Sequence, residues 1–378
     1  MQATKAIIHL DNLRRNINEA RKIAGAYPKI CFAVKADGYG HGSVPVSRAA
    51  LAVGVEYLSV AGVSEAADLR AAGITAPILL LSQAQPEELS HIASMDLTPL
   101  VSDAEFIEEA AAAAKCAGKK ITVHLKIDTG MGRLGCHDEE ALPLAHKIAS
   151  SGELSLGGIA THLSVSDSLK PDDIAYTKEQ INNFGKIIAS VKKAGIDPGI
   201  AHAANSGALV FHEDSFFDMI RPGLFLYGYL PADARISPNT MPQVEPVMEL
   251  QSKVVFIKKM KKGSQISYGR TWIAPEDTFI GIIPAGYADG FPWKLSNNHS
   301  VCIRGKSYPL VGQVCMDQCI VNLGTETEVK RWDKAVIFGP GFITAADMAE
   351  KLSALPYEIM CGINKRVPRE YSTAPMDN

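Results

Sequence analysis

The sequence lacks the features that mark several common protein classes. No stretch approaches the ~20 apolar residues that span a bilayer, and the first twenty residues hold no apolar run of secretory length. The formal net charge of the 378-residue chain is only -3, so charge gives no reason to expect nucleic acid or anionic lipid as a partner. We therefore expect a cytoplasmic enzyme, long enough for two domains.

Cysteine is scarce and scattered. The seven cysteines are an odd number, and the closest pair, Cys315 and Cys319, has no second pair that would complete four metal ligands. This usage favours reduced thiols over a disulfide framework or a zinc site. We expect no metal.

A dinucleotide-binding signature is incomplete. The spacing G-x-G-x-x-G occurs once, as G-M-G-R-L-G at residues 130–135 after the strand expected at 121–128, but the next helix is expected only from 138. Because the fingerprint requires a helix that opens at the glycines, the alternative of an open doubly wound sheet that binds a dinucleotide is weak.

Residues 11–236 instead alternate short apolar strands with helices rich in Ala and Leu. The pattern predicts helices at 11–25, 64–72, 86–93, 103–117, 138–151 and 172–194. It predicts strands at 30–34, 56–62, 77–82, 96–102, 121–128, 156–164, 200–207 and 216–223. Eight βα units over about 220 residues match a (β/α)8 TIM barrel, an α/β fold, better than an open sheet.

The composition changes after residue 236. The segment S-P-N-T-M-P-Q-V-E-P holds three prolines and predicts a domain boundary. Beyond it, strands are expected at 249–259, 279–284, 300–304, 313–323 and 334–338, with hairpin turns at K-K-G-S and I-R-G-K-S and one helix at 344–353. We expect a mostly-β C-terminal domain over 237–378, joined by an N-terminal strand within 1–10.

A glycine-rich motif, A-V-K-A-D-G-Y-G-H-G, overlaps the end of the first strand of the expected barrel. Lys35 stands at the carboxyl end of that strand, where α/β proteins place their chemistry. A partly desolvated lysine presents a neutral amine for Schiff-base chemistry with an aldehyde. The alternative is a lysine that caps the strand and pairs with Asp37.

Other polar residues follow further strands and should converge on one mouth of the barrel. They are Tyr39, Lys126, Asp128, Arg133, His162, His202, Asn205, Ser206 and Arg221. Together with Lys35 they suit an anionic ligand that carries both phosphate and carboxylate.

Three of these residues invite a chemical interpretation. Ser206, at or near a helix N-cap, would cradle phosphate, with a plain cap as the alternative. Arg221 can only donate hydrogen bonds, so facing a pyridine nitrogen it would keep that nitrogen unprotonated. His162 would lie against a flat ring or orient a neighbour, and the alternative is a satisfied core histidine.

The motifs in combination resemble those of the bacterial alanine racemases, fold-type III enzymes that use pyridoxal 5'-phosphate (PLP). The resemblance runs from H-L-D-N-L-R-R-N to R-V-P-R-E-Y and includes K-I-D-T-G-M-G-R-L-G, A-A-N-S-G, R-P-G-L-F-L-Y-G, I-S-Y-G-R, G-Y-A-D-G-F and V-G-Q-V-C-M-D-Q-C. It implies an isomerase that interconverts L-alanine and D-alanine through a PLP external aldimine by a two-base mechanism. The product D-alanine would supply peptidoglycan, and the enzyme would be a homodimer with shared active sites.

The resemblance also implies roles for individual residues. Lys35 would hold PLP and act as one base, and Tyr268, from the second subunit of a head-to-tail dimer, would be the other. Arg133 and the backbone of Met316 would hold the substrate carboxylate, and Tyr287 would line the entrance. The residues that would bind the cofactor are Lys35, Tyr39, His162, Asn205, Ser206, Arg221, Gly223, Leu224 and Tyr357.

Lys126 carries an additional possibility. In some members of the family the corresponding lysine is carbamylated by CO2, and the added carboxylate orients the arginine that corresponds to Arg133. Lys126 stands seven residues before Arg133, which matches that pattern. The alternative is a plain lysine paired with Asp128.

Rival functions remain to be discriminated. A decarboxylase on the same two-domain fold would need a G-G-G phosphate loop and an acidic partner for the pyridine, whereas this chain has no G-G-G and carries R-P-G at the eighth strand. A non-catalytic PLP carrier built from the barrel alone would lack residues 237–378. Racemisation of serine by the same machinery is a further alternative, because small changes at a pocket edge admit a hydroxyl.

Overall fold

The computed structural model describes residues 3–231 and 241–372. Its backbone separates into two compact units, one comprising residues 14–38 and 43–244 and the other residues 1–13, 39–42 and 245–378. We call the first the barrel unit and the second the β unit. The domain boundary predicted at 236–237 lies outside the described residues.

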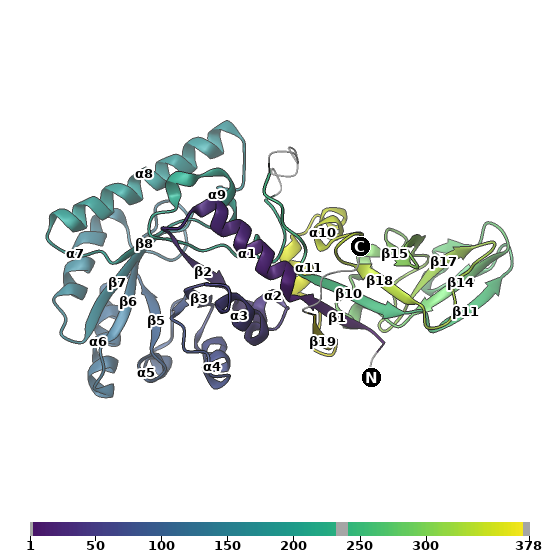
Figure 1. Cartoon of the computed structure of the whole chain (residues 1–378), viewed down its shortest axis with the longest axis horizontal. Coiled ribbons are helices and arrows are strands. Elements are labelled where there is room, and N and C mark those ends of the chain that lie inside the picture. Colours follow the sequence, from purple (N-terminus) through teal and green to yellow (C-terminus); the bar gives the residue numbers. More distant parts are fainter. Residues whose placement is uncertain (1–2, 232–240, 373–378) are drawn as a thin grey trace. The chain divides into compact units, whose positions relative to one another are not determined.

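The barrel unit is built on an eight-stranded parallel sheet in the order β8-β7-β6-β5-β4-β3-β2-β9 (Figure 1). Its strands are β2 (Lys29–Ala33), β3 (Tyr57–Val60), β4 (Ile78–Leu80), β5 (Leu97–Val101), β6 (Ile121–Lys126), β7 (Leu154–Ala160), β8 (Ile200–His202) and β9 (Met219–Ile220). The ends of the sheet meet where Asp218 N–H donates to Ala201 O at 3.0 Å and Arg221 N–H donates to Ala204 O at 2.8 Å. The predicted (β/α)8 barrel is confirmed, and all eight predicted strands are present, most of them shorter than predicted, while β2 and β7 begin earlier.

Helices lie outside the barrel strands (Figure 1). They are α1 (Leu10–Ala24), α3 (Ser43–Leu51), α4 (Val63–Ala71), α5 (Leu89–Ser94), α6 (Ala104–Ala117), α7 (Asp138–Ala149), α8 (Pro171–Lys193) and α9 (Ser206–Phe211), with 3-10 turns η1 (Pro86–Glu88) and η2 (Glu213–Ser215). In α1 the side chains of Leu13, Ile17 and Ala20 recur at helical spacing and are fully buried or nearly so. The six predicted barrel helices are therefore confirmed, the one at 86–93 as η1 followed by α5.

The described residues of the β unit form three sheets. A six-stranded sheet has the order β16-β15-β18-β10-β1-β19, and the smaller sheets have the orders β11-β14-β17 and β12-β13. The strands are β1 (Lys5–His9), β10 (Met248–Lys253), β11 (Phe256–Met260), β12 (Gln265–Ile266), β13 (Trp272–Ile273), β14 (Thr278–Ile283), β15 (Ser300–Ile303), β16 (Lys306–Pro309), β17 (Cys319–Gly324), β18 (Lys334–Phe338) and β19 (Arg369–Ser372). The N-terminal β1 pairs antiparallel with β10 and parallel with β19.

Several details of the β unit differ from the prediction. The strand expected at 249–259 is two strands, because the chain changes sheets at Val254, whose N–H donates to Asp333 O. The K-K-G-S turn does not form a hairpin, since β11 pairs with β14, whereas the I-R-G-K-S hairpin is confirmed by the pair Ile303 and Lys306. The strand expected from 313 begins only at Cys319.

The helix content of the β unit was also underestimated. Beside α10 (Ala345–Leu352), which was predicted, the chain forms α11 (Pro356–Cys361). Pro356 occupies the first turn of α11, where its missing N–H costs nothing. The described part of the unit also includes the short 3-10 turns η5 (Tyr268–Arg270), η6 (Tyr287–Asp289) and η7 (Trp293–Leu295).

Membrane and metal features are absent from the described part of the chain. Within residues 3–231 and 241–372 no helix combines the length and the apolar character needed to cross a bilayer. The same residues contain no group of three or more His, Cys, Asp or Glu that could hold a metal ion. The seven cysteines all lie within these residues and form no disulfide bond there.

Candidate active site

Lys35 opens a turn of left-handed backbone directly after β2. The segment α2 (Lys35–Tyr39) has positive φ angles of 52° at Ala36, 53° at Asp37 and 62° at Gly38, and Tyr39 continues with 51°. Each non-glycine residue in this region costs roughly 1–2 kcal/mol. Strained backbone of this kind concentrates at functional sites, where the surrounding structure holds it in place.

Hydrogen bonds from neighbouring elements hold this turn. Gly38 N–H donates to Val34 O at 2.8 Å, and Ser43 N–H donates to the Asp37 carboxylate at 2.8 Å. The Glu65 carboxylate accepts from Ala36 N–H at 2.7 Å. The turn is thus held by the end of β2, the start of α3 and the start of α4.

Arg221 lies partly buried just after β9 and donates in several directions. Its Nη1 donates to His202 Nδ1 at 2.7 Å, and its Nη2 donates to Thr161 O at 2.7 Å, to Ala203 O at 3.0 Å and to His162 Nδ1 at 3.4 Å. Burial lowers the pKa of Arg221 to about 10, so the guanidinium stays charged near neutral pH. Among the described residues, its Nε hydrogen and one Nη1 hydrogen have no acceptor, which leaves donors for a ligand.

The histidines around Arg221 are neutral. Burial and the charge of Arg221 lower the pKa of His124 to about 3, and the same two causes hold the pKa values of His162 and His202 well below the ordinary 6.5. His162 also feels Lys126, Arg133 and Lys35. The charges that act most strongly on His162 are therefore all cationic.

Lys126 stands at the carboxyl end of β6 with only 7% of its surface exposed. Burial, followed by the nearby charges of Arg221 and Arg133, lowers its pKa well below the ordinary 10.5. The Asp128 carboxylate instead accepts from the N–H groups of Gly130, Met131, Gly132 and Arg133, at 2.8 to 3.0 Å. Within the described residues Lys126 and Asp128 form no ion pair, so the pairing alternative is wrong in this structure.

Arg133 lies on the loop that Asp128 organises, and its side chain is exposed. The end of the loop is bonded to the end of β6, because Cys136 N–H donates to Lys126 O at 2.9 Å. Gly135 is required here, because a Cβ atom would lie 2.5 Å from Asp128 N. The loop thus places an exposed cationic side chain close enough for its charge to act on buried Lys126.

The helix that follows β8 begins at Ser206, which agrees with the prediction that Ser206 lies at or near a helix N-cap. Asn205, not Ser206, caps α9, because the Asn205 carboxamide oxygen accepts from Ala208 N–H at 3.0 Å. Ser206 is the first helical residue, and its hydroxyl oxygen accepts from Gly223 N–H at 2.9 Å and Phe225 N–H at 3.2 Å. Leu224 is buried between these two donors along the chain.

Tyr39 and Tyr357 meet within the β unit. Their ring centroids are 5.3 Å apart, and Tyr357 lies on α11. Burial, followed by the proximity of Tyr357, raises the pKa of Tyr39. Tyr39 therefore stays a neutral phenol that can donate a hydrogen bond.

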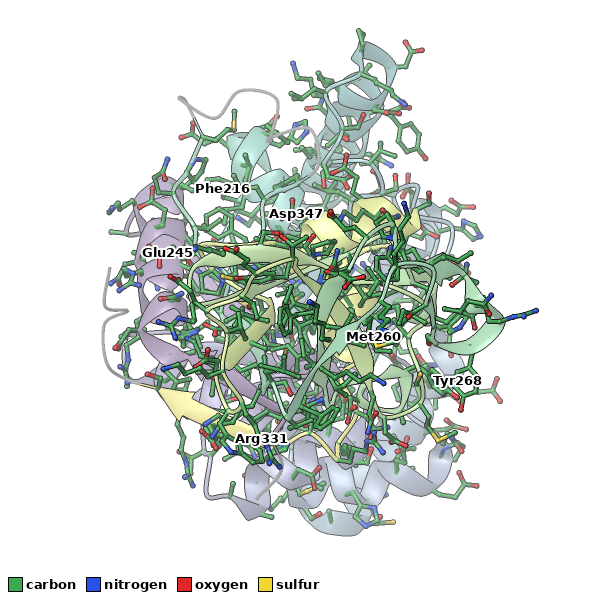
Figure 2. All side chains as sticks on the ribbon, turned by 90° about the vertical axis from the view of Figure 1, so that its right-hand side faces the viewer. Phe216, Glu245, Met260, Tyr268, Arg331 and Asp347 are labelled. Atoms are coloured by element: carbon green, nitrogen blue, oxygen red, sulfur yellow. The ribbon has the colours of Figure 1, made fainter. Side chains whose placement is uncertain are left out.

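Tyr268 lies at the surface of the β unit (Figure 2). Its side chain is 70% exposed, and the preceding Ser267 has a φ of 63°. The Ser267 hydroxyl donates to Gln313 O at 2.7 Å, which ties the Tyr268 turn to residues 312–318. We call residues 312–318 the carboxylate loop, because they include Met316, whose backbone the family resemblance predicts to hold the substrate carboxylate.

The carboxylate loop also contacts the turn that carries Tyr287. Tyr287 N–H donates to Cys315 O at 3.1 Å, and Ala288 N–H donates to Met316 O at 3.0 Å. Gly286 permits this approach, since a Cβ atom there would lie 2.3 Å from Met316 O. The side chains of Tyr287 and Met316 are 45% and 53% exposed, so backbone contacts fix their positions.

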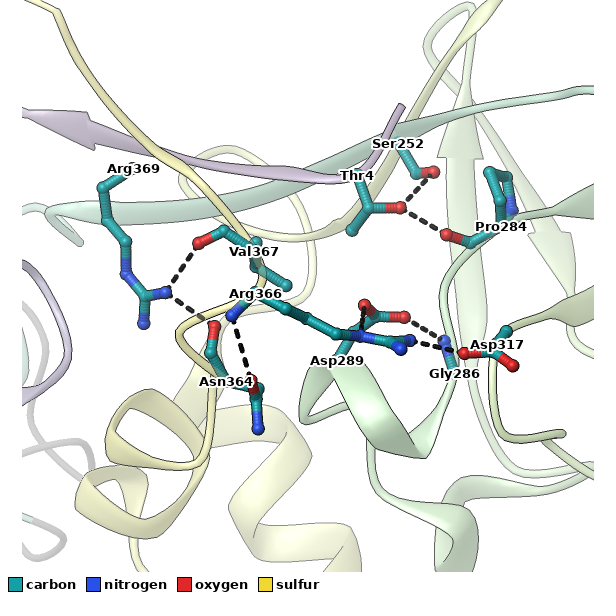
Figure 3. A network of polar contacts seen from close by, with 10 residues as sticks. All are labelled: Thr4, Ser252, Pro284, Gly286, Asp289, Asp317, Asn364, Arg366, Val367 and Arg369. Carbon is teal, nitrogen blue, oxygen red and sulfur yellow. Dashed lines mark hydrogen bonds and ion pairs between the residues drawn. The ribbon is translucent and has the colours of Figure 1, made fainter. Parts of the chain in front are cut away.

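Arg366 joins the same two segments through side chains (Figure 3). Its Nε donates to the Asp289 carboxylate at 2.8 Å, and its Nη2 donates to the Asp317 carboxylate at 2.7 Å. The second oxygen of Asp289 accepts from Gly286 N–H at 2.9 Å. These two carboxylates raise the pKa of Arg366.

Sequence reasoning missed four residues that organise these sites. Ser267 and Arg366 lie within recognised motifs, but no local pattern shows what their side chains contact. Glu65 carried a weak signal, an acidic residue in the first turn of a predicted helix. His124 sits inside a buried strand, and nothing in its neighbourhood along the chain indicates the contact with His202.

Family models match most of the chain. Residues 8–231 match the model of the alanine racemase N-terminal domain, and residues 247–371 match that of the alanine racemase C-terminal domain. The chain is 48% identical to the alanine racemase of Treponema denticola over 375 residues, which cover 98% of each chain. It is 44% identical to that of Treponema pallidum, with 98% of this chain and 100% of the relative covered.

Solved structures agree with the sequence relatives. The alanine racemase of Clostridium difficile 630 matches with a TM-score of 0.92 at 35% identity, covering 98% of this chain and 96% of that one. Both the barrel unit and the β unit are therefore found together in characterised proteins.

Proposed function

This chain belongs to the alanine racemase family, whose members are isomerases, and we propose that it interconverts L-alanine and D-alanine with pyridoxal 5'-phosphate as cofactor. Two features of the structure support placing this activity at particular residues. They are the strained turn at Lys35 and the cationic surroundings of His162. The proposal includes the cytoplasm as location and peptidoglycan as the destination of D-alanine, both implied by the sequence resemblance.

The barrel residues fit an anionic aromatic cofactor. Arg221 retains unused donors for a ring nitrogen that stays unprotonated, and neutral His162 can lie against the ring without adding charge. Ser206 and the N–H groups of Gly223 and Leu224 would bind the phosphate, with the phenols of Tyr39 and Tyr357 as further donors. Asn205 would act by holding Ser206 at the start of α9.

The bound cofactor would serve as an electron sink that makes the α-hydrogen of an amino acid acidic. Lys35 would hold the cofactor through its amine and then exchange a proton at Nζ. Racemisation needs removal of a proton on one face of Cα and return on the other, so a second base is required. Tyr268 would provide it at Oη.

The exposure of Tyr268 supports a shared active site. A phenol that is 70% exposed on a single chain cannot exclude bulk water from a proton transfer. A second copy of the chain would cover it, and the partner subunit's Tyr268 would face Lys35. We therefore propose a homodimer in which each active site uses residues of both chains.

Substrate recognition would combine two kinds of group. Arg133 would pair with the alanine carboxylate, and the Met316 N–H would donate to the same group. Tyr287, on the turn that contacts the carboxylate loop, would line the entrance and limit the size of the side chain. This arrangement favours a small amino acid.

Lys126 has the properties that carbamylation requires. Because its pKa is well below the ordinary value, its amine is neutral for a larger fraction of time and can attack CO2. The carboxylate formed would offset the cations around it and orient Arg133. Protein incubated with 13C-bicarbonate should show a carbamate carbon resonance that Lys126→Arg lacks, and equal spectra for both proteins would contradict the modification.

One experiment tests the function as a whole. The purified protein with PLP should absorb as a Schiff base, convert L-alanine to D-alanine, and carry a pyridoxyl label on Lys35 after borohydride reduction. Tyr268→Phe should keep the label and lose racemisation. Release of CO2 from a diamino acid would favour a decarboxylase, and a labelled protein without any turnover would favour a carrier. The same assay with serine in place of alanine would measure whether the enzyme also racemises serine.

A further inference from the structure

Glu65 links the turn at Lys35 to the start of α4. Its Oε1 accepts from Ala36 N–H and its Oε2 from Ala61 N–H, both at 2.7 Å. Ala36 is the residue directly after Lys35, so the carboxylate holds the peptide group attached to the lysine Cα. Hydrogen bonds to a charged acceptor are roughly twice as strong as neutral ones.

The contact to Ala36 is more than an ordinary helix cap. An acidic residue in the first helical turn commonly accepts from a backbone N–H at the helix start, as Glu65 does from Ala61. The other oxygen reaches a peptide 29 residues earlier, at the point where the left-handed turn begins. Without this acceptor, Ala36 and Asp37 would be drawn back to the more favourable φ angles of L-residues.

We propose that Glu65 is a positioning residue for Lys35. Its carboxylate keeps the left-handed turn in place and thereby fixes the backbone from which the lysine side chain leaves. The inference rests on the proposed function, since it matters for catalysis only if Lys35 carries the cofactor. A small displacement of a reacting group lowers a rate strongly, because the bound geometry must be close to that of reaction.

Three variants distinguish a role of Glu65 in positioning Lys35 from a role in the stability of the whole protein. Glu65→Ala removes both acceptors, and Glu65→Gln keeps the length and volume but replaces one acceptor oxygen by a donor. Asp68→Asn is the matched control, because Asp68 is an exposed acidic residue on the same helix. For each protein, hydrogen exchange of the peptide 35–42 is measured without cofactor. Borohydride labelling of Lys35, the pH titration of the Schiff-base absorbance, and kcat and KM are measured with PLP.

For Glu65→Ala we expect exchange at Ala36 to accelerate about tenfold or more and kcat to fall about ten- to hundredfold with a smaller change in KM. The pH titration of the Schiff-base absorbance should also shift in Glu65→Ala. Glu65→Gln should give values between those of Glu65→Ala and the wild type, and Asp68→Asn should match the wild type. If Glu65→Ala does not fold, Glu65→Gln decides. Unchanged exchange, titration and kcat in the folded variants would overturn the proposal, as would a loss of kcat with unchanged exchange and titration.

Failure of the proposed function gives a different result. If wild-type Lys35 takes no pyridoxyl label, the assignment of the lysine fails, and the exchange measurement still shows whether Glu65 holds the turn. If Lys35 is labelled at equal rates in the wild type and both Glu65 variants and exchange is equal, the positioning role alone fails.

Discussion

His202 Nε2 lies 2.8 Å from His124 Nδ1, and both imidazoles are buried in the barrel unit. Arg221 donates to the other nitrogen of His202, so Nδ1 of His202 accepts and Nε2 must carry the hydrogen. His202 therefore donates to His124. Each ring is fixed in one neutral tautomer, and the orientation of Arg221 depends on a chain of contacts that reaches across three strands.

This pair makes stability depend on pH. The pKa of His124 is lowered to about 3 in the folded protein, and that of His202 is also lowered, from an ordinary value of 6.5. Above pH 6.5 both rings are neutral in both states, so their contribution is fully present. As the pH falls below 6.5 the unfolded chain binds protons that the folded protein does not. Stability is then lost, for His124 down to about pH 3, at about 1.4 kcal/mol per pH unit for each histidine.

The measurement is urea unfolding between pH 6.5 and 4.5 for the wild type and His124→Gln. The glutamine can still accept from His202 but does not titrate, so its stability should fall less steeply with decreasing pH. His91→Gln removes an exposed histidine and serves as the control. Equal slopes for the wild type and His124→Gln would show that the buried pair does not control acid stability.

The sequence predicted the barrel because its signal is local. Each barrel strand is a short apolar run and each helix shows its own periodicity, as Leu13, Ile17 and Ala20 do in α1. The β unit was predicted less well, because an alternating pattern does not reveal where a chain changes sheets, as it does at Val254. The contacts of Glu65 and Arg366 bridge residues far apart in the chain, so only the folded structure shows them.

Arg366 should control substrate binding more than chemistry. Arg366→Gln removes the charge that joins Asp289 to Asp317, so the Tyr287 turn and the carboxylate loop lose their side-chain link. We expect the KM for alanine to rise about three- to tenfold, with kcat reduced by a smaller factor. Steady-state kinetics in both directions would measure this.

Lys365→Gln is the matched control, since it removes a neighbouring exposed cation. It should leave both constants within a factor of about two. An Arg366→Gln enzyme with an unchanged KM, or one in which only kcat falls, would argue that the two segments hold their positions through backbone contacts alone.

Gly40 and Gly54 offer a comparison of backbone strain with steric overlap. Both have positive φ angles, 80° and 89°, so alanine at either position should cost roughly 1–2 kcal/mol. A Cβ atom at Gly40 would also lie 2.3 Å from Met360 O, whereas nothing lies within 4 Å at Gly54. Gly40→Ala should therefore lose about 1–3 kcal/mol more than Gly54→Ala in urea unfolding. Similar losses of stability in the two variants would mean that α11 moves away from the added Cβ atom at little cost.

A shared active site predicts that two inactive variants complement one another. Lys35→Ala lacks the cofactor lysine, and Tyr268→Phe lacks the second base, so each homodimer should be inactive. In a mixed dimer one site combines both changes, but the other pairs an intact Lys35 with the partner subunit's Tyr268, also intact. With random exchange of subunits, half of the dimers are mixed, so about a quarter of all sites should be of the wild-type kind.

The assay mixes the purified variants at equal concentration after a cycle of mild dissociation, and follows D-alanine formation. Activity should rise from background to about one quarter of the wild-type value. A tagged copy of each variant confirms by co-purification that mixed dimers formed. If mixed dimers form and activity stays at background, Tyr268 does not serve a site on the other chain. Because each variant chain lacks either Lys35 or Tyr268, recovery cannot arise from a site built within one chain.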